Sequence, residues 1–247
     1  MTDQVFIKHL GSSVQSWLNY ISAVGRGFVL GESSVKLPLA EFIGTNIADT
    51  NAVKLEHPHP NFLQKRLDLY FKRESNKVEY QTAFEFKYIK DASTLDLSEK
   101  KRVFSDLMRL YFFIKDAKVP TKGYFLICGS QYEFNQSFQK ISTPIISIVP
   151  RLNIPVNIPH KSGFYTKWFK FSNQYPIQSI DLNINDVEYQ NIYIDFISKY
   201  KNPYFKKMKI KLIMPKKIKT KLVFLSQDNI LKDVPEPMKL GIWEILI

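Results

Sequence analysis

The sequence predicts an α/β (α+β) protein, and three patterns in its first half carry that prediction. Apolar and polar residues alternate from 80 to 88, which is typical of a strand. Apolar residues recur at helical spacing from 97 to 114, which predicts a long amphipathic helix. Residues 124–129 are almost wholly apolar, as in a buried strand. With 247 residues, of which 45% are hydrophobic, the chain can bury a substantial core.

Two neighbouring strands flank a polar connection at residues 73–77, which predicts a tight reversal. That reversal places Asp68 opposite Glu85, and the period of two puts Glu85 and Lys87 on the same face. Opposite β-carbons in an antiparallel ladder lie about 4.5–5.5 Å apart. We therefore expect the three side chains to project into one solvent-accessible cleft.

Like charges across a ladder destabilise it, so Asp68 and Glu85 need a metal cation, a proton or a salt bridge. Two carboxylates without a nearby His or Cys suit Mg²⁺ or Mn²⁺. Lys87 would then orient or deprotonate an attacking water, or neutralise charge developing on a phosphate. The alternative is structural: Lys87 and Arg66 would simply neutralise two surface carboxylates on a half-exposed sheet.

With these residues, the stretch from about Glu32 to Ser130 resembles the PD-(D/E)XK nuclease superfamily. Its restriction-endonuclease-like core runs helix, three strands, helix, strand around a mixed central sheet. The resemblance implies that Asp68 and Glu85 bind Mg²⁺ or Mn²⁺ together with the backbone carbonyl of Phe86, and that Lys87 is the catalytic lysine. Leu67 stands where the family motif has proline, at a position that varies and is not itself catalytic.

Members of this superfamily often add a glutamate from the helix before the first strand, and two candidates are present. Glu32 falls near the apolar side of the predicted helix and Glu41 falls opposite, so Glu32 is the favoured fourth catalytic residue. Pro38 leaves a second possibility open. The helix could start only near Leu37, which would leave Glu32 in a loop.

On the predicted helix at 97–114, Arg102, Asp106 and Arg109 share a polar face. This face could be solvated and carry ion pairs within the helix. Alternatively, Arg102 and Arg109 could contact the nucleic-acid backbone.

The charge balance favours a nucleic-acid partner. The chain has 35 Lys and Arg against 23 Asp and Glu, a net charge of +12. Such an excess is typical of proteins that neutralise phosphates. No apolar stretch approaches the length of about 18 residues that spans a membrane, so we expect no membrane interaction. The start of the chain lacks a signal-peptide pattern, and Cys128 is the only cysteine, so the expected location is cytoplasmic.

The residue pattern of the chain changes after residue 142, where prolines interrupt short apolar runs. We therefore divide the chain into a nuclease-like core with N-terminal helices at 1–142 and a β-rich basic extension at 143–247. The extension is either separate or packed onto the core as one domain. Strands are expected near 168–171, 208–214, 220–225 and 240–246, and a helix at 187–199.

Lysines alternate with apolar residues between 206 and 221, which predicts a basic hairpin. Lys209, Lys211, Lys217 and Lys219 would share one of its faces. They would either contact a phosphate backbone or protect an edge strand against aggregation.

The sequence thus predicts a metal-dependent endonuclease acting on DNA, or less favourably on RNA, and a homodimer would suit cleavage of both strands. One alternative is a catalytically inactive nucleic-acid-binding or assembly protein that keeps the nuclease fold. Another is a protein whose basic surface meets an acidic protein partner.

Overall fold

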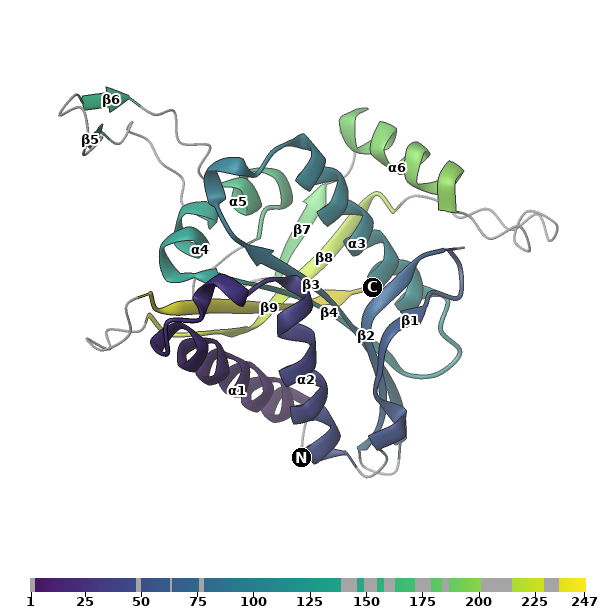
Figure 1. Cartoon of the computed structure of the whole chain (residues 1–247). Coiled ribbons are helices and arrows are strands. Elements are labelled where there is room, and N and C mark those ends of the chain that lie inside the picture. Colours follow the sequence, from purple (N-terminus) through teal and green to yellow (C-terminus); the bar gives the residue numbers. More distant parts are fainter. Residues whose placement is uncertain are drawn as a thin grey trace.

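The chain is an α/β protein built on one mixed sheet with helices on both faces (Figure 1). The computed structural model describes residues 3–47, 50–62, 64–75, 78–138, 146–148, 155–157, 163–171, 179–183, 187–200, 215–228 and 236–247. The strand order is β1-β2-β3-β4-β9-β8-β7, and β3 and β4 are its parallel neighbours. The predicted fold class is confirmed at this level.

The helices are α1 (Asp3–Ala23), α2 (Glu32–Asn46), α3 (Leu97–Lys115), α4 (Gln131–Phe138), α5 (Phe164–Phe169) and α6 (Val187–Tyr200). The strands of the sheet are β1 (Lys54–Pro58), β2 (Arg66–Ser75), β3 (Val78–Ile89), β4 (Thr121–Ser130), β7 (Ser179–Asn183), β8 (Lys217–Leu225) and β9 (Met238–Leu246). A separate two-stranded ladder joins β5 (Ile146–Ile148) to β6 (Pro155–Asn157). From α2 to β4 the order is helix, three strands, helix, strand, as the resemblance led us to expect.

The predicted register between β2 and β3 is confirmed. The two strands pair antiparallel from Leu69↔Phe84 to Ser75↔Val78. The ladder ends at Leu69, one residue short of Asp68, so the strands part at the position where the sequence places the first carboxylate.

The two faces of the sheet carry separate apolar cores. Phe84 and Phe86 of β3 pack into the core under α1 and α2, whereas Ala83 packs into the core under α3. Glu85 shares the α3 face with Ala83, because side chains alternate along a strand. The alternation predicted for β3 is therefore correct, and the candidate residues face α3.

Helix α3 lies close over the sheet, and local features of the sequence hold it there. The Asp96 carboxylate caps its first turn by accepting the backbone N–H groups of Ser98 and Glu99. Gly123 of β4 leaves room for the helix, since a β-carbon there would come within 2.8 Å of Ile114. This close packing brings polar side chains of α3 within reach of β3.

The second half of the chain differs in part from the prediction. β9 pairs with β4 and so extends the central sheet, and the predicted helix is present as α6. The strand expected near 168–171 is wrong, because Trp168 and Phe169 form the end of α5. Gly163 and Lys170, which flank this helix, are both in the left-handed conformation. Residues 208–214 lie outside the described residues. The predicted basic hairpin therefore falls partly outside the described residues, and its described part, β8, pairs with β7 and β9.

In the described part of the chain, no helix has the length and apolar character needed to cross a membrane.

Candidate functional site

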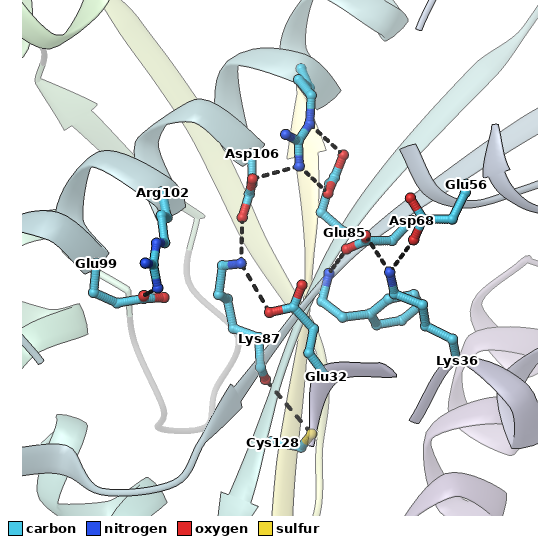
Figure 2. Close-up of polar contacts among 12 residues, drawn as sticks. Glu32, Lys36, Glu56, Asp68, Glu85, Lys87, Glu99, Arg102, Asp106 and Cys128 are labelled. Carbon is cyan, nitrogen blue, oxygen red and sulfur yellow. Dashed lines mark hydrogen bonds and ion pairs between the residues drawn. The ribbon is translucent and has the colours of Figure 1, made fainter. Parts of the chain in front are cut away.

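Asp68 fills the gap that opens where β2 and β3 part (Figure 2). Its Oδ2 accepts the backbone N–H of Phe86 at 2.8 Å. Its Oδ1 accepts a hydrogen bond from the Lys36 ammonium of α2, also at 2.8 Å. The carboxylate thus replaces the lost backbone pairing of β3, and its side chain remains only 10% exposed.

Glu85 is fully buried and is held by Arg109 of α3. The guanidinium donates through Nε to Oε1 at 2.8 Å and through Nη2 to Oε2 at 2.6 Å. Burial raises the pKa of Glu85 well above its ordinary value, although Arg109 acts in the opposite direction. Arg109 therefore does not lie on a solvated helix face, and this correction follows from the close packing of α3 on β3.

Asp106 links the two cations of the site and was not predicted as a site residue. Its Oδ1 accepts a 2.5 Å hydrogen bond from Nη2 of Arg109, and its Oδ2 lies 2.8 Å from Nζ of Lys87. The signal in the sequence is its spacing of three residues from Arg109, and the ion pair within the helix that this spacing allows is present. Its burial, with 4% of the residue exposed, depends on packing against β3.

Lys87 lies between Asp106 and Glu32, with 3.2 Å from Nζ to Oε2 of Glu32. Burial lowers the pKa of Lys87, but the carboxylates of Asp106 and Glu32 together outweigh burial, so the pKa is raised. Lys87 consequently stays a cation at neutral pH. It can orient a ligand or neutralise negative charge, but it is a poor acceptor of a proton from water.

Glu32 begins α2 and reaches the site from its first turn. The helix continues through Pro38, so the possibility that it starts near Leu37 is wrong. Burial raises the pKa of Glu32, and the nearby charge of Lys87 opposes this shift. Glu41 is exposed, so the choice of Glu32 over Glu41 agrees with their positions.

Glu56 of β1 adds a further carboxylate, which forms an ion pair with Lys36. In all, five carboxylates meet three cations: Glu32, Glu56, Asp68, Glu85 and Asp106 against Lys36, Lys87 and Arg109. With every group ionised, the formal charge of this cluster is minus two. We refer to these eight residues as the charge cluster.

The charge cluster is less accessible than we expected. Asp68, Glu85 and Lys87 are 7%, 0% and 8% exposed, so the expected solvent-accessible cleft is wrong for these side chains. Ion partners from α2 and α3 cover them. The structural alternative, in which Lys87 and Arg66 neutralise the two strand carboxylates, is also wrong. Lys36 pairs with Asp68, and Arg109 pairs with Glu85.

The donor atoms are of the kind that a hard divalent cation prefers, but hydrogen-bond donors of the protein already bind them. Both oxygens of Asp68 and both oxygens of Glu85 accept hydrogen bonds. Among the described residues no group of three His, Cys, Asp or Glu side chains is arranged to hold a metal. The carbonyl of Phe86 points to the same strand edge as its N–H, toward Asp68. The oxygen donors and the formal charge of minus two of the charge cluster suit Mg²⁺ or Mn²⁺. Binding of the ion to Glu85 requires that Arg109 first release the carboxylate.

The predicted nucleic-acid contacts lie in different places. The side chain of Arg102 is 69% exposed. Its Nη1 lies 3.4 Å from Oε2 of Glu99. Arg102 and Glu32 both line a cavity of about 370 Å³. Glu32 is also the residue that forms an ion pair with Lys87. Lys217 and Lys219 are exposed on β8, but they alternate with Ile218, which packs on the α3 face, so they lie on the opposite face from Glu85.

Lys209 and Lys211 lie outside the described residues.

No known family model matches this chain, and no match was found among curated proteins or solved structures.

Proposed function

We propose that this chain is a metal-dependent phosphodiesterase that cleaves DNA, built on a restriction-endonuclease-like core. The observation that carries the proposal is the convergence of Asp68, Glu85, Lys87 and Glu32 from β2, β3 and α2. Their cluster has two more carboxylates than cations, which a divalent cation would balance.

Asp68, Glu85 and the carbonyl of Phe86 would hold Mg²⁺ or Mn²⁺. When bound, such an ion supplies Lewis-acid chemistry and lowers the pKa of water. Lys87 supplies a fixed positive charge for the phosphate, and Asp106 holds its ammonium in position. This division of work follows from the raised pKa of Lys87, which keeps its proton.

Glu32 is better suited than Lys87 to accept a proton. Burial raises the pKa of Glu32, so its carboxylate holds a proton more readily than an ordinary glutamate, and its side chain is 40% exposed. It also borders the cavity that contains Arg102. A water next to Glu32 would thus have a proton acceptor on one side and the cation of Lys87 on the other.

A second function is favoured by the bidentate pair of Arg109 and Glu85. If this pair persists when Mg²⁺ is present, the chain would bind nucleic acid without cleaving it. The net charge of +12 supports binding in either case.

Cleavage of labelled single- and double-stranded DNA in Mg²⁺ or Mn²⁺ tests the proposal. We expect cleavage by the wild type and a loss of at least about 100-fold in Asp68→Asn. Glu41→Gln, which removes an exposed carboxylate of α2 outside the site, is the control and should cleave normally. Binding of DNA without cleavage, unaffected by Mg²⁺, would support the second function instead.

A further inference from the structure

The cavity beside the charge cluster is larger than the proposed chemistry requires. It lies between the end of β3 and the first turns of α3, where Glu99 and Arg102 line it together with Glu32 (Figure 2). Its volume of about 370 Å³ falls within the range of about 300–1,000 Å³ that is typical of ligand sites. The cavity therefore has room for a part of the substrate next to the phosphate.

The charges of the cavity disfavour a phosphate inside it. Four carboxylates and two cations line it, namely Glu32, Asp91, Asp96, Glu99, Lys90 and Arg102. The carboxylates of Asp91 and Asp96 already accept backbone N–H groups at the start of the two helices that follow them. The excess of negative charge repels an anion and favours a ligand that brings N–H donors.

Tyr165 gives the cavity a buried hydroxyl. The residue is 1% exposed, and its ring stacks with Phe138 and Phe171 in the core, so the hydroxyl end is the part that reaches the cavity. This hydroxyl has no hydrogen-bond partner among the described residues. Burial and the nearby charge of Glu99 raise the pKa of Tyr165 well above its ordinary value. The hydroxyl therefore keeps its proton and can donate it to an acceptor of a ligand.

Glu99 supplies an acceptor to the same cavity. Its side chain is 18% exposed, its Oε2 accepts from Arg102 at 3.4 Å, and its Oε1 has no partner in the described part of the chain. A carboxylate next to a hydroxyl is complementary to guanine, whose Watson–Crick edge presents N1–H and an amino group beside the acceptor O6. Only an unpaired guanine exposes this edge.

We propose that the cavity receives one unpaired guanine base, with Glu99 accepting its N1–H and amino group and Tyr165 donating to its O6. Lys90 and Arg102 are exposed cations that line the same cavity, and they would contact the phosphates on either side of the base. This inference rests on the proposed function, since it names the substrate as DNA with an unpaired guanine beside the scissile phosphate.

Binding of labelled single-stranded DNA in the presence of EDTA tests the inference without reference to cleavage. The probes are short oligothymidines with one central guanine or one central hypoxanthine, which lacks only the amino group of guanine. We expect the wild type to bind the guanine probe about 10-fold more tightly, because the amino group donates to a charged acceptor. In duplexes made from the two probes this preference should disappear, since pairing hides the edge of the base.

Two variants assign the preference to its residues. Glu99→Met keeps the length of the side chain but removes the acceptor, so the preference should fall below about twofold. Tyr165→Phe removes only the hydroxyl, and it should weaken binding of both probes about fivefold, because guanine and hypoxanthine share O6. Glu41→Met is the matched control, since it removes an exposed carboxylate of α2 that does not line the cavity, and it should keep the wild-type preference.

Equal affinity of the wild type for the two single-stranded probes would overturn the inference. A folded Glu99→Met variant that keeps the full preference would also overturn it. If a variant does not fold, the ratio measured for the wild type decides alone.

The same probes in Mg²⁺ separate this inference from the proposed function. Cleavage of both probes without a difference in affinity would refute the guanine pocket and leave the phosphodiesterase intact. A preference for guanine without cleavage would leave the pocket intact and favour a protein that only binds nucleic acid.

Discussion

Arg109 donates two hydrogen bonds to the carboxylate of Glu85, 2.8 Å to Oε1 and 2.6 Å to Oε2, and the Glu85 carboxylate has no exposed surface. A bidentate pair of this kind is among the strongest polar contacts in proteins. Breaking it from one side leaves a buried charge without a partner. Arg109 therefore stabilises the fold and also competes with any metal ion for Glu85.

Arg109→Met should lower the free energy of unfolding by about 3–5 kcal/mol, because Glu85 loses its counter-ion in the protein interior. Mn²⁺ should then raise the melting temperature of the variant more than that of the wild type, since the ion can replace the lost cation. Denaturation with and without Mn²⁺ measures both effects. Arg102→Met, at an exposed position of the same helix, should change stability by less than about 0.5 kcal/mol. A variant that Mn²⁺ does not stabilise would argue against metal binding at Glu85.

Glu32→Gln should reduce metal-dependent cleavage by about 100-fold or more, because the reaction loses its proton acceptor. The wild-type rate should rise with pH through the raised pKa of Glu32, and the variant should lose this rise. Glu41→Gln should match the wild type at every pH. The account of Glu32 as a base is wrong if both variants show the wild-type pH profile.

His59 should make the protein less stable in mild acid. Burial lowers its pKa to about 3, and its Nε2–H donates to the backbone carbonyl of Arg109, so the ring is neutral in the folded state. In the unfolded chain it binds a proton below about pH 6.5. The stability that His59 confers is thus complete above pH 6.5 and is lost as the pH falls toward 3, by up to about 1.4 kcal/mol per pH unit.

Urea denaturation at pH 7.5 and pH 5.5 measures this effect as the difference in slope between the wild type and His59→Gln. The comparison is needed because Glu32 and Glu85, with raised pKa values, bind protons more readily in the folded state and act in the opposite direction. His9→Gln changes an exposed histidine of α1 and should keep the wild-type slope. An unchanged slope in His59→Gln would mean that the ring is protonated in the folded protein.

Lys217→Gln/Lys219→Gln should weaken DNA binding for every sequence tested. If each lysine contacts one phosphate, the slope of log affinity against log salt concentration should fall by about 1.8 in magnitude. Single-turnover cleavage at saturating protein should stay the same, because these lysines lie on the opposite face of the sheet from Glu85. Lys54→Gln/Lys118→Gln, at exposed lysines elsewhere, is the comparison. An unchanged salt slope would assign Lys217 and Lys219 to solubility or edge protection.

Local patterns in the sequence predicted one part of the site and not the rest. The register of Asp68 with Glu85 follows from a short reversal and a period of two, and both are properties of neighbouring residues. The partners of these carboxylates come from other elements: Lys36 lies 32 residues before Asp68, and Arg109 lies 24 residues after Glu85. How α2 and α3 pack on the sheet is a tertiary property, so the burial of the site could not be read from periodicity.

The wrong strand near 168–171 has a local cause. Its aromatic residues favour β-structure, but the left-handed residues Gly163 and Lys170 on either side enclose a short helix. Phe164, Tyr165 and Phe169 then pack into the core under α3, which outweighs intrinsic propensity.

The central claim is that Asp68 and Glu85 together bind a catalytic divalent cation. A crystal structure of the wild type soaked in Mn²⁺, with anomalous scattering recorded for manganese, tests it most directly. We predict one anomalous peak in contact with a carboxylate oxygen of Asp68 and one of Glu85, at about 2.1 Å, with Arg109 moved away from at least one oxygen of Glu85. A map with no peak at this position, in which Arg109 still donates both hydrogen bonds to Glu85 at saturating Mn²⁺, would contradict the claim.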